Sequence, residues 1–306
     1  MIRRTMDDLR DARASALATQ PMRPAGPRSG IFGGTLQSLR DIFSHRELVG
    51  LLVRREIKAR YKDSILGFFW SLARPIALLL VYWVAIGKFL GAERNIPEFA
   101  IYIFTGLTAW QLFSDIVSTG TGSIVVNSGL IKKVYVPREV FPLSVVGSAL
   151  FNFGIQLVIL LGFTAIRGQF PTGERWLYFI LGFSVLVTFA SALALILSAV
   201  NVYLRDVQYL VEIVLMLAFW ASPIVYSWSQ ITSQVSSELV QNIYASNPMT
   251  QVIFAFQRAF WVAGDGQPMP DDLGVRLLIT LGISIVLLWI GQRVFSRLQS
   301  NFAQEL

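Results

Sequence analysis

The sequence predicts an all-α integral membrane protein with six transmembrane helices and both termini in the cytoplasm. The first observation is composition: 54% of the 306 residues are hydrophobic and 15% are charged, whereas soluble domains carry roughly 25% charged residues. A mean hydropathy of +0.56 agrees with this class. The second observation is that the charges lie between long apolar stretches. The third is that Lys and Arg are shared unequally among the intervening segments, which sets an orientation.

The six spans follow from the length of the apolar stretches. A helix needs about 20 mainly apolar residues to cross the ~30 Å hydrocarbon core of a bilayer. The stretches that meet this requirement are 70–91, 99–118, 140–166, 176–203, 209–229 and 274–293. The third and fourth are the clearest, because neither contains Asp, Glu, Lys or Arg. We therefore expect a six-span domain over residues 70–300.

The orientation follows from the positions of Lys and Arg, which cytoplasmic loops retain. With the N-terminus inside, the cytoplasmic segments hold 20 of these residues and the external segments hold six. The external ones are Lys88, Arg94, Arg167, Arg175, Arg258 and Arg276. Residues 1–40 supply much of the excess, but the bias keeps its sign without them. These residues have no secretory-signal pattern and are expected to form a mobile cytoplasmic tail.

A basic amphipathic helix is expected over residues 41–69, directly before the first span. Val49, Val53 and Ile57 recur at four-residue spacing on one face, and the cations follow another face. The basic residues are Arg54, Arg55, Lys58, Arg60 and Lys62. Such a helix lies in the headgroup layer, with its apolar side toward lipid and its cations toward anionic lipid or a cytoplasmic partner. A lipid-surface anchor with no further role is the alternative.

The stretch from residue 228 to residue 272 is half apolar, but Asn247-Pro248 interrupts it. Proline excludes a straight helix at this point, because it lacks an N–H and biases the preceding residue away from helix. Short re-entrant or interfacial helices that dip into the outer leaflet would fit this pattern. An external hairpin packed on the spans would fit equally well, and the sequence leaves the two open.

The residues argue against catalysis in this chain. There is no cysteine and a single histidine, His45, so a disulfide, a thiolate metal site or a His-based triad is not expected. The phosphate-binding pattern G-x-x-x-x-G-K-S/T does not occur, and Thr119-Gly120-Thr121-Gly122 is interpreted as a loop or a helix end. We expect no catalytic, cofactor or metal residues. The positive charge suits a membrane face rather than nucleic acid.

The apolar stretches contain few ionisable residues but many aromatic ones. Asp115, Glu212 and Lys88 fall near the ends of spans and are interpreted as boundary residues. Sugar rings stack through their C–H faces on aromatic planes, so aromatic side chains could line a conduit for a polymer. The candidates for such a lining are Tyr82, Trp83, Phe89, Phe219, Trp220 and Tyr226. Aromatic belts at the headgroup level are the alternative.

Several motifs together resemble a known family. They are RREIKARYKDSILGFFWSLARP at 54–75, NSGLIKKVYVPREVFPL at 127–143, NVYLRD at 201–206, Ser222-Pro223-Ile224 and Asn247-Pro248. In this order they look like the permease subunit of polysaccharide and polyol-phosphate ABC exporters, which include the O-antigen, capsule, teichoic acid and lipid-linked galactan exporters. The similarity covers about residues 40 to 300, and the tail before residue 40 departs from the shortest members.

The resemblance implies a homodimer of six-span subunits in the plasma (inner) membrane, joined to two ATP-binding subunits and exporting a lipid-linked glycan. ATP and magnesium would be bound by the partner, and this chain would hold no cofactor. A short cytoplasmic helix would couple to the ATPase through Leu130, Ile131, Lys132, Lys133, Val134, Tyr135, Pro137 and Arg138. The basic interfacial helix would admit the lipid diphosphate. The first and fifth spans would line the conduit, and the helices around Asn247 would cap it outside.

Two other functions stay open from the residues alone. A drug or small-lipid exporter of the same superfamily would have a conduit poor in aromatic residues. A membrane-embedded sugar or acyl transferase would be active as a purified chain with no ATPase present. Neither accounts for the basic amphipathic helix that leads into the first span.

Overall fold

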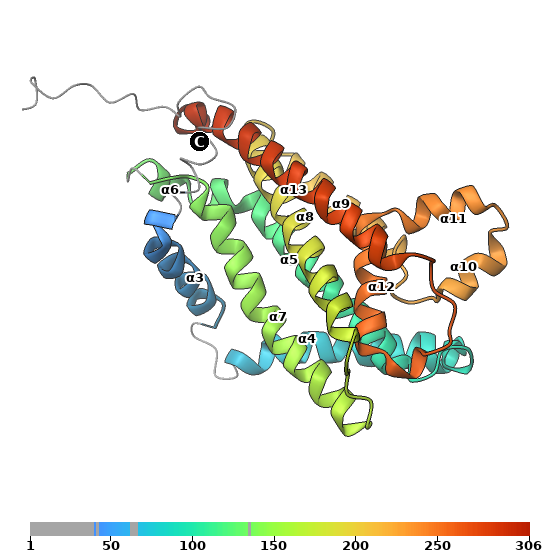
Figure 1. Ribbon diagram of the computed structural model, residues 1–306. Coiled ribbons are helices and arrows are strands. Elements are labelled where there is room, and N and C mark those ends of the chain that lie inside the picture. Colours follow the sequence, from blue (N-terminus) through green and yellow to red (C-terminus); the bar gives the residue numbers. More distant parts are fainter. Residues whose placement is uncertain (1–39, 41–42, 62–66, 134–135) are drawn as a thin grey trace, which may run out of the picture.

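The computed structural model describes residues 40, 43–61, 67–133 and 136–306, and every regular element in these ranges is a helix (Figure 1). Except for Arg40, the predicted tail lies outside the described residues. Long helices lie side by side in a bundle, and shorter helices cover its two ends (Figure 1). The predicted all-α class is confirmed for the part of the chain that the structure describes.

In the described ranges, four helices are long and apolar enough to cross a membrane. They are α5 (Phe99–Val126), α7 (Val140–Ile166), α8 (Arg175–Tyr203) and α13 (Leu273–Leu298). These helices correspond to the second, third, fourth and sixth predicted spans. Helix α8 is the centre of the bundle, because it packs against both α5 and α13 and also contacts α7.

The other two apolar segments are shorter. Helix α4 (Gly67–Tyr82) continues into the π-helical segment η1 (Trp83–Phe89), and α9 (Val207–Trp220) has 14 residues. At 1.5 Å per residue α9 is about 21 Å long, which is less than the ~30 Å hydrocarbon core. It ends at Trp220 rather than at residue 229, because Pro223 cannot donate a helical hydrogen bond. The count of six spans therefore stays a prediction.

The segment after α9 is irregular yet buried, and side chains donate hydrogen bonds to its backbone carbonyl oxygens. The Tyr102 hydroxyl donates to the carbonyl oxygens of Pro223 (3.2 Å) and Tyr226 (2.6 Å). The Gln257 Nε2 donates to the same Pro223 carbonyl at 2.8 Å. Gly106 of α5 lets this backbone approach closely, because a Cβ there would lie 3.4 Å from the Ile224 Cα. Irregular backbone at such a position is stable only when protein groups replace the missing water.

Three short helices precede the last long one: α10 (Trp228–Gln234), α11 (Glu238–Ala245) and α12 (Pro248–Phe260). The Asn247 side chain accepts a hydrogen bond from the Met249 N–H, which fixes the start of α12, and Pro248 occupies the first helical position. Helix α12 is buried on nearly all sides among α5, α7, α8 and α13. Helices α10 and α11 instead project from the bundle (Figure 1). Whether these helices enter the outer leaflet or form an external hairpin stays a prediction.

The remaining short elements lie at the ends of the bundle. They are α3 (Arg46–Tyr61), α6 (Ser128–Ile131), η2 (Ala92–Arg94), η3 (Val262–Gly264), η4 (Gln299–Asn301) and α14 (Phe302–Glu305). Of the predicted helix over 41–69, the structure describes α3 up to Tyr61 and the start of α4 from Gly67. Residues 62–66 between them lie outside the described residues.

Close helix contacts depend on small residues, and one of them corrects a prediction. Thr119-Gly120-Thr121-Gly122 is not a loop or a helix end but lies within α5. A Cβ at Gly120 would lie 2.7 Å from the Ala194 Cβ of α8, and one at Gly182 would lie 2.7 Å from the Ala255 Cβ of α12. The glycines serve helix packing here, as small residues do in membrane bundles.

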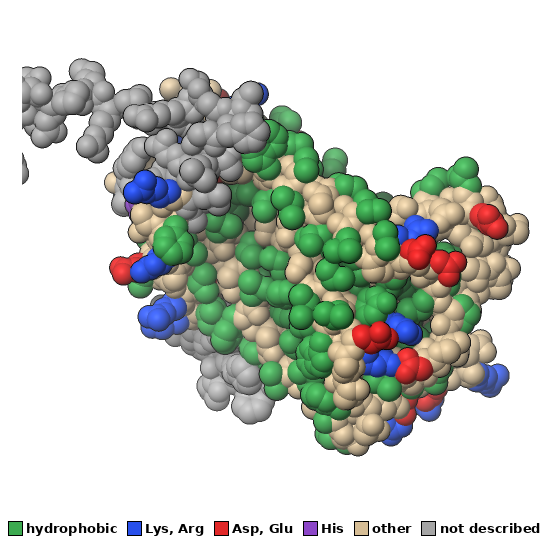
Figure 2. Space-filling view, viewed as in Figure 1, with side chains coloured by type: hydrophobic (Ala, Val, Ile, Leu, Met, Phe, Trp, Pro, Cys, Tyr) green, Lys and Arg blue, Asp and Glu red, His purple; other side chains and the backbone are tan. Residues whose placement is uncertain are grey.

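Hydrophobic side chains cover much of the outer surface. Figure 2 shows them over the middle of the bundle, with charged side chains gathered toward its ends. The exposed apolar residues include Leu210, Ile213 and Leu217 on α9 and Leu278, Ile283 and Val286 on α13. An exposed apolar surface of this extent requires lipid or a protein partner.

We expect Gly120→Val to destabilise the fold by about 1–3 kcal/mol, because the added methyl groups force α5 away from α8. Thermal unfolding of the purified protein in detergent measures the loss. Gly162→Val on α7 is the matched control, since no heavy atom lies within 4 Å of a Cβ at that position. Equal destabilisation by the two substitutions would contradict the packing role of Gly120.

Candidate functional site

The predicted coupling segment lies at one end of the bundle, beside the start of α3 and the C-terminal end of the chain (Figure 1). A second hydrophobic core joins these elements, separate from the main core of the bundle. Its buried members are Leu52, Ile124, Ile131, Val140, Phe141, Leu195, Ala199, Val202, Phe295 and Phe302. Residues from α3, α5, α6, α7, α8, α13 and α14 thus form one packed unit.

Asn127 connects three of these elements. It ends α5 and precedes α6, and its own Nδ2 donates to the Ser123 carbonyl at 2.8 Å. Its Oδ1 accepts a hydrogen bond from the Arg55 Nη2 of α3 at 2.6 Å. The Asn127 side chain is buried, so the guanidinium contact replaces water that this amide would otherwise bind. Movement of α6 must therefore act on α3 as well as on α5.

The coupling residues divide into a buried part and an exposed part. Ile131 is buried and Leu130 packs against the same core, which fixes α6 on the bundle. Lys132 and Lys133, directly after the helix, are exposed. Two further predicted coupling residues, Val134 and Tyr135, lie outside the described residues. The exposed lysines present positive charge at the end of the molecule, where an acidic partner surface could contact them.

The residues that follow attach this segment to the C-terminal helices. The Arg138 guanidinium lies 5.6 Å from the centre of the Phe302 ring, a cation–π contact. Pro137 is half-buried beside it. The Glu139 carboxylate, 4% exposed, accepts a hydrogen bond from the Gln299 Nε2 at 3.4 Å. The entry into α7 is therefore tied to the last residues of the chain.

Helix α3 packs its apolar side against α7 rather than presenting all of it to lipid. Val53 contacts Gly147, where a Cβ would lie 2.7 Å from the Val53 Cγ2. The half-buried Glu56 carboxylate accepts hydrogen bonds from the Ser144 Oγ (2.9 Å) and the Ser148 Oγ (3.0 Å). An acid on the packed side of a basic helix was not singled out from the sequence, because its two serine partners lie about 90 residues away.

The basic residues of α3 have different surroundings. Arg54 and Lys58 are exposed, whereas the Arg55 guanidinium binds Asn127. The side chain of Arg60 and the whole of Lys62 lie outside what the structure describes. Arg54, Arg55 and Lys58 are all exposed, so all three described candidates are accessible to a lipid diphosphate, although Arg55 already binds Asn127.

The predicted aromatic lining is brought together in part. The Tyr82 and Phe219 ring centres lie 5.8 Å apart, which joins the ends of α4 and α9. Trp220, 55% exposed, is 5.5 Å from Phe219, and Trp110 of α5 is 5.7 Å from the same ring. Trp110 belongs to this cluster, although it is not one of the six lining candidates.

The other three aromatic candidates have different contacts. Trp83 has the Lys88 ammonium 5.1 Å from its ring centre, and Phe89 is 83% exposed. The Tyr226 hydroxyl donates to the Trp220 carbonyl at 2.9 Å and lies 3.2 Å from the Tyr244 hydroxyl. Burial, followed by the contact with Tyr226, raises the pKa of Tyr244. Tyr226 thus links the end of α9 to the projecting helix α11.

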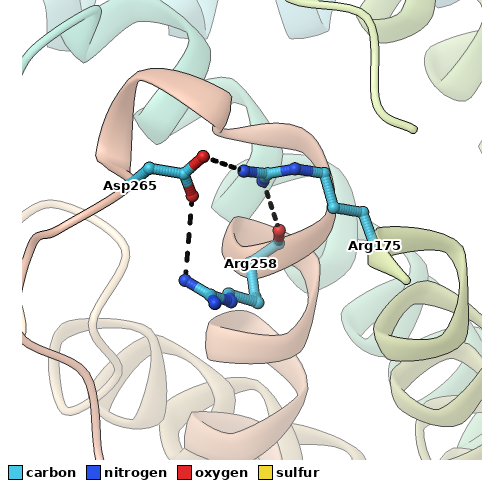
Figure 3. Close-up of polar contacts among 3 residues, drawn as sticks. All are labelled: Arg175, Arg258 and Asp265. Carbon is cyan, nitrogen blue, oxygen red and sulfur yellow. Dashed lines mark hydrogen bonds and ion pairs between the residues drawn. The ribbon is translucent and has the colours of Figure 1, made fainter. Parts of the chain in front are cut away.

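A cluster of charges joins α8 to α12 at the opposite end of the bundle (Figure 3). The Asp265 carboxylate pairs with the Arg175 Nη2, and its other oxygen lies 3.7 Å from the Arg258 Nη1. The Arg175 Nη1 also donates to the Arg258 carbonyl at 2.8 Å, near the C-terminal end of α12. A guanidinium is favourable at this end of a helix, where carbonyl groups are unpaired. The start of α8 thereby holds the end of α12.

Further pairs at this end neutralise cations that were predicted to be external. The Lys88 ammonium lies 2.7 Å from the Glu93 carboxylate, and Arg167 pairs with Glu98. The hydrogen bond to Glu98 raises the pKa of Arg167. Counting Lys and Arg alone missed this compensation, since it depends on acids in neighbouring loops.

Within the described ranges, no group of three or more His, Cys, Asp or Glu side chains could hold a metal ion.

Comparison with known families gives one match over most of the chain. Residues 47–261 match the family model described as ABC-2 type transporter. The matched range contains α3 except its first residue, the coupling segment, the aromatic cluster and α12. Arg175 and Arg258 lie within it, and their common partner Asp265 lies just beyond.

Curated relatives extend the similarity to nearly the whole chain. The O-antigen export system permease protein RfbA of Myxococcus xanthus is 34% identical over 271 residues, which are 89% of this chain and 100% of that protein. An RfbA of Klebsiella pneumoniae is 27% identical over 85% of this chain and 95% of its own length. The polysialic acid transport protein KpsM of Escherichia coli is 25% identical over 81% and 92%, respectively.

We expect the double variant Ser144→Ala/Ser148→Ala to lose about 1–3 kcal/mol of stability, because the Glu56 carboxylate keeps its burial and loses both donors. Adding Glu56→Met should restore most of this loss, since an apolar group needs no donor. Thermal unfolding in detergent compares the variants, with Ser184→Ala on α8 as the control. If the triple variant is as unstable as the double variant, the serines do not act through Glu56.

Proposed function

The chain belongs to the ABC-2 type transporter family, and on this premise we infer that it is the permease subunit of an exporter of cell-surface polysaccharide. The observation that carries this conclusion is the 34% identity with an O-antigen export permease over the whole length of that protein. The chain is a multi-pass protein of the plasma membrane. It is a transport permease and not an enzyme, because ATP is hydrolysed in a separate subunit.

We propose that Lys132, Lys133 and the residues around them receive the motion of the ATP-binding subunits. Ile131 and Leu130 anchor the segment in the second core, so a force on the exposed lysines reaches the bundle. Asn127 and Arg55 then carry the displacement to α3, and Arg138 carries it to the C-terminal helices. A rigid-body shift of these joined elements is the expected response.

The cargo is proposed to be a polysaccharide attached to a lipid diphosphate, which enters beside α3. Two phosphates match the exposed cations of this helix, because guanidinium and ammonium groups bind phosphate oxygens by charge-assisted hydrogen bonds. Arg55 is exposed as well but also binds Asn127, so the groups to test are the exposed Arg54 and Lys58. Removing both charges is expected to weaken transport of the lipid-linked cargo more than it weakens the fold.

The conduit is proposed to form between two copies of this chain. Helix α9 buries Val211 and Leu215 within one copy, partly buries Val207, Ala218 and Phe219, and exposes an apolar face made of Leu210, Ile213, Val214, Met216 and Leu217. A second copy would cover that surface and bring two sets of the Tyr82, Phe219 and Trp220 aromatics face to face. Such planes would let a sugar polymer slide without one tight site.

The function and its coupling can be tested in the native organism. Deletion of the gene should abolish polysaccharide on the cell surface and leave lipid-linked polymer inside, and a plasmid copy should restore export. Lys132→Glu/Lys133→Glu should fail to restore it while the protein inserts normally, because charge reversal repels an acidic partner surface. Surface polysaccharide is measured with a specific antibody or lectin, and membrane abundance by immunoblotting.

Arg94→Glu is the matched control, since it reverses an exposed charge at the opposite end. It should export like the wild type. Unchanged surface polysaccharide after gene deletion would overturn the proposed function. Full export by the double lysine variant, with deletion still abolishing export, would overturn the coupling assignment alone.

The two-copy arrangement can be tested by cross-linking, because the chain has no cysteine. Met216→Cys on α9 should give a covalent dimer with a short bismaleimide in native membranes, since its exposed side chain would face the partner. Ile283→Cys on α13 has similar exposure, 60% against 59%, and should stay monomeric. Equal cross-linking at both positions would contradict an interface on α9.

A further inference from the structure

A cavity of about 300 Å³ lies between the projecting helices α10 and α11 and the start of α13. This size is at the lower end of the range for small-molecule sites. The cavity is at the same end of the bundle as the ion pairs of the loops, which is the predicted external end. Six side chains give it its chemistry: Trp228, Glu238, Gln241, Asn242, Asp271 and Arg276.

One wall of the cavity contains an oriented aromatic ring. The Ser227 N–H donates to the Gln230 Oε1 at 2.9 Å in a capping box, which fixes the start of α10 and with it Trp228. The Trp228 ring centre lies 6.3 Å from Tyr244 in a stacked arrangement and 5.7 Å from Phe254 edge-to-face. These contacts hold an amphipathic plane at the cavity before any ligand arrives.

The guanidinium in the cavity is also held in place. The Arg276 Nη2 donates to the Asn242 Oδ1 at 2.7 Å, and its Nε donates to the Asp271 carbonyl at 3.1 Å. These bonds occupy part of its five-donor fork and fix its direction. The remaining donors can bind hydroxyl oxygens without a large loss of side-chain entropy on binding.

Two carboxylates in the cavity remain acceptors. Among the residues that the structure describes, neither Glu238 nor Asp271 forms an ion pair with Lys or Arg. Both are exposed, so water solvates them until a ligand replaces it. Together with Arg276 they give the lining a net charge of about −1 at neutral pH, which disfavours an anionic ligand.

We propose that this cavity is a binding subsite for a neutral sugar unit of the exported polysaccharide. An aromatic plane, two carboxylate acceptors and a fixed guanidinium donor match the apolar face and the hydroxyl edge of a hexose ring. The polar lining excludes a lipid tail, and its charge disfavours an acidic sugar. The subsite rests on the proposed function, because its ligand is the exported polysaccharide as it leaves the conduit. Occupancy there would hinder the polymer from sliding back.

The test uses the full-length permease with its ATPase partner in lipid nanodiscs. Saturation-transfer NMR measures binding of two neutral probes, mannotriose and galactobiose, and of one anionic probe, trisialic acid. At least one neutral probe should bind saturably in the millimolar range, about tenfold more tightly than trisialic acid. Glu238→Gln and Asp271→Asn should each weaken binding of the neutral probe about tenfold, because a hydrogen bond to a neutral amide replaces one to a charged carboxylate. Both positions are exposed, so the variants should fold.

Glu174→Gln is the matched control, an exposed acid at the same end but outside the cavity. It should bind like the wild type. The subsite is refuted if neither neutral probe binds the wild type, if trisialic acid binds better, or if the control weakens binding as much as the cavity variants. ATP-dependent export of surface polysaccharide, measured in cells, is the separate readout for the proposed function, and intact export without sugar binding refutes the subsite alone.

Discussion

The arrangement of this bundle depends on the requirement that every backbone polar group away from water has a protein partner. The chain departs from helix between α9 and α10, inside the packed structure, and exposes carbonyl oxygens there. Tyr102 and Gln257 supply the hydrogen bonds, one from α5 and one from α12. Because both donors bind the Pro223 carbonyl, the break, α5 and α12 form one unit. This unit lets α12 enter the bundle and turns α10 and α11 outward.

The other end of the molecule is organised by side chains that serve two elements at once. Asn127 closes α5 and binds α3, and Glu139 begins α7 and binds the C-terminal segment. A second core beneath them gives the end its own rigidity. Export powered by a separate subunit needs a rigid contact surface at this end, because a flexible segment would change its own conformation and would not transmit the displacement to the bundle. The main bundle can then move as a body.

Long apolar runs are the part of this fold that sequence reasoning predicts well. The span over 140–166 agrees with α7 at both ends, because no charge interrupts it and its one proline, Pro142, lies in the first turn, where a helix tolerates proline. The second span was predicted to end at residue 118, but α5 continues to Val126, since Gly120 packs on Ala194 instead of breaking the helix. Partners distant in sequence, such as Glu56 with Ser144, and the acids that pair with external cations, had no local signal. The sugar subsite combines three segments and was equally hidden.

The π-helical segment η1 has a consequence for how this part of the chain can vary. Its hydrogen bonds close wider rings than those of an α-helix, as in the bond from the Leu90 N–H to the Ala85 carbonyl at 3.1 Å. The wider turn accommodates a surplus residue while the flanking helices keep their places. A one-residue deletion within Trp83–Phe89 would then tighten the coil locally and leave α4 and α5 in register. Length polymorphism among homologous permeases should concentrate in this stretch rather than in the long helices.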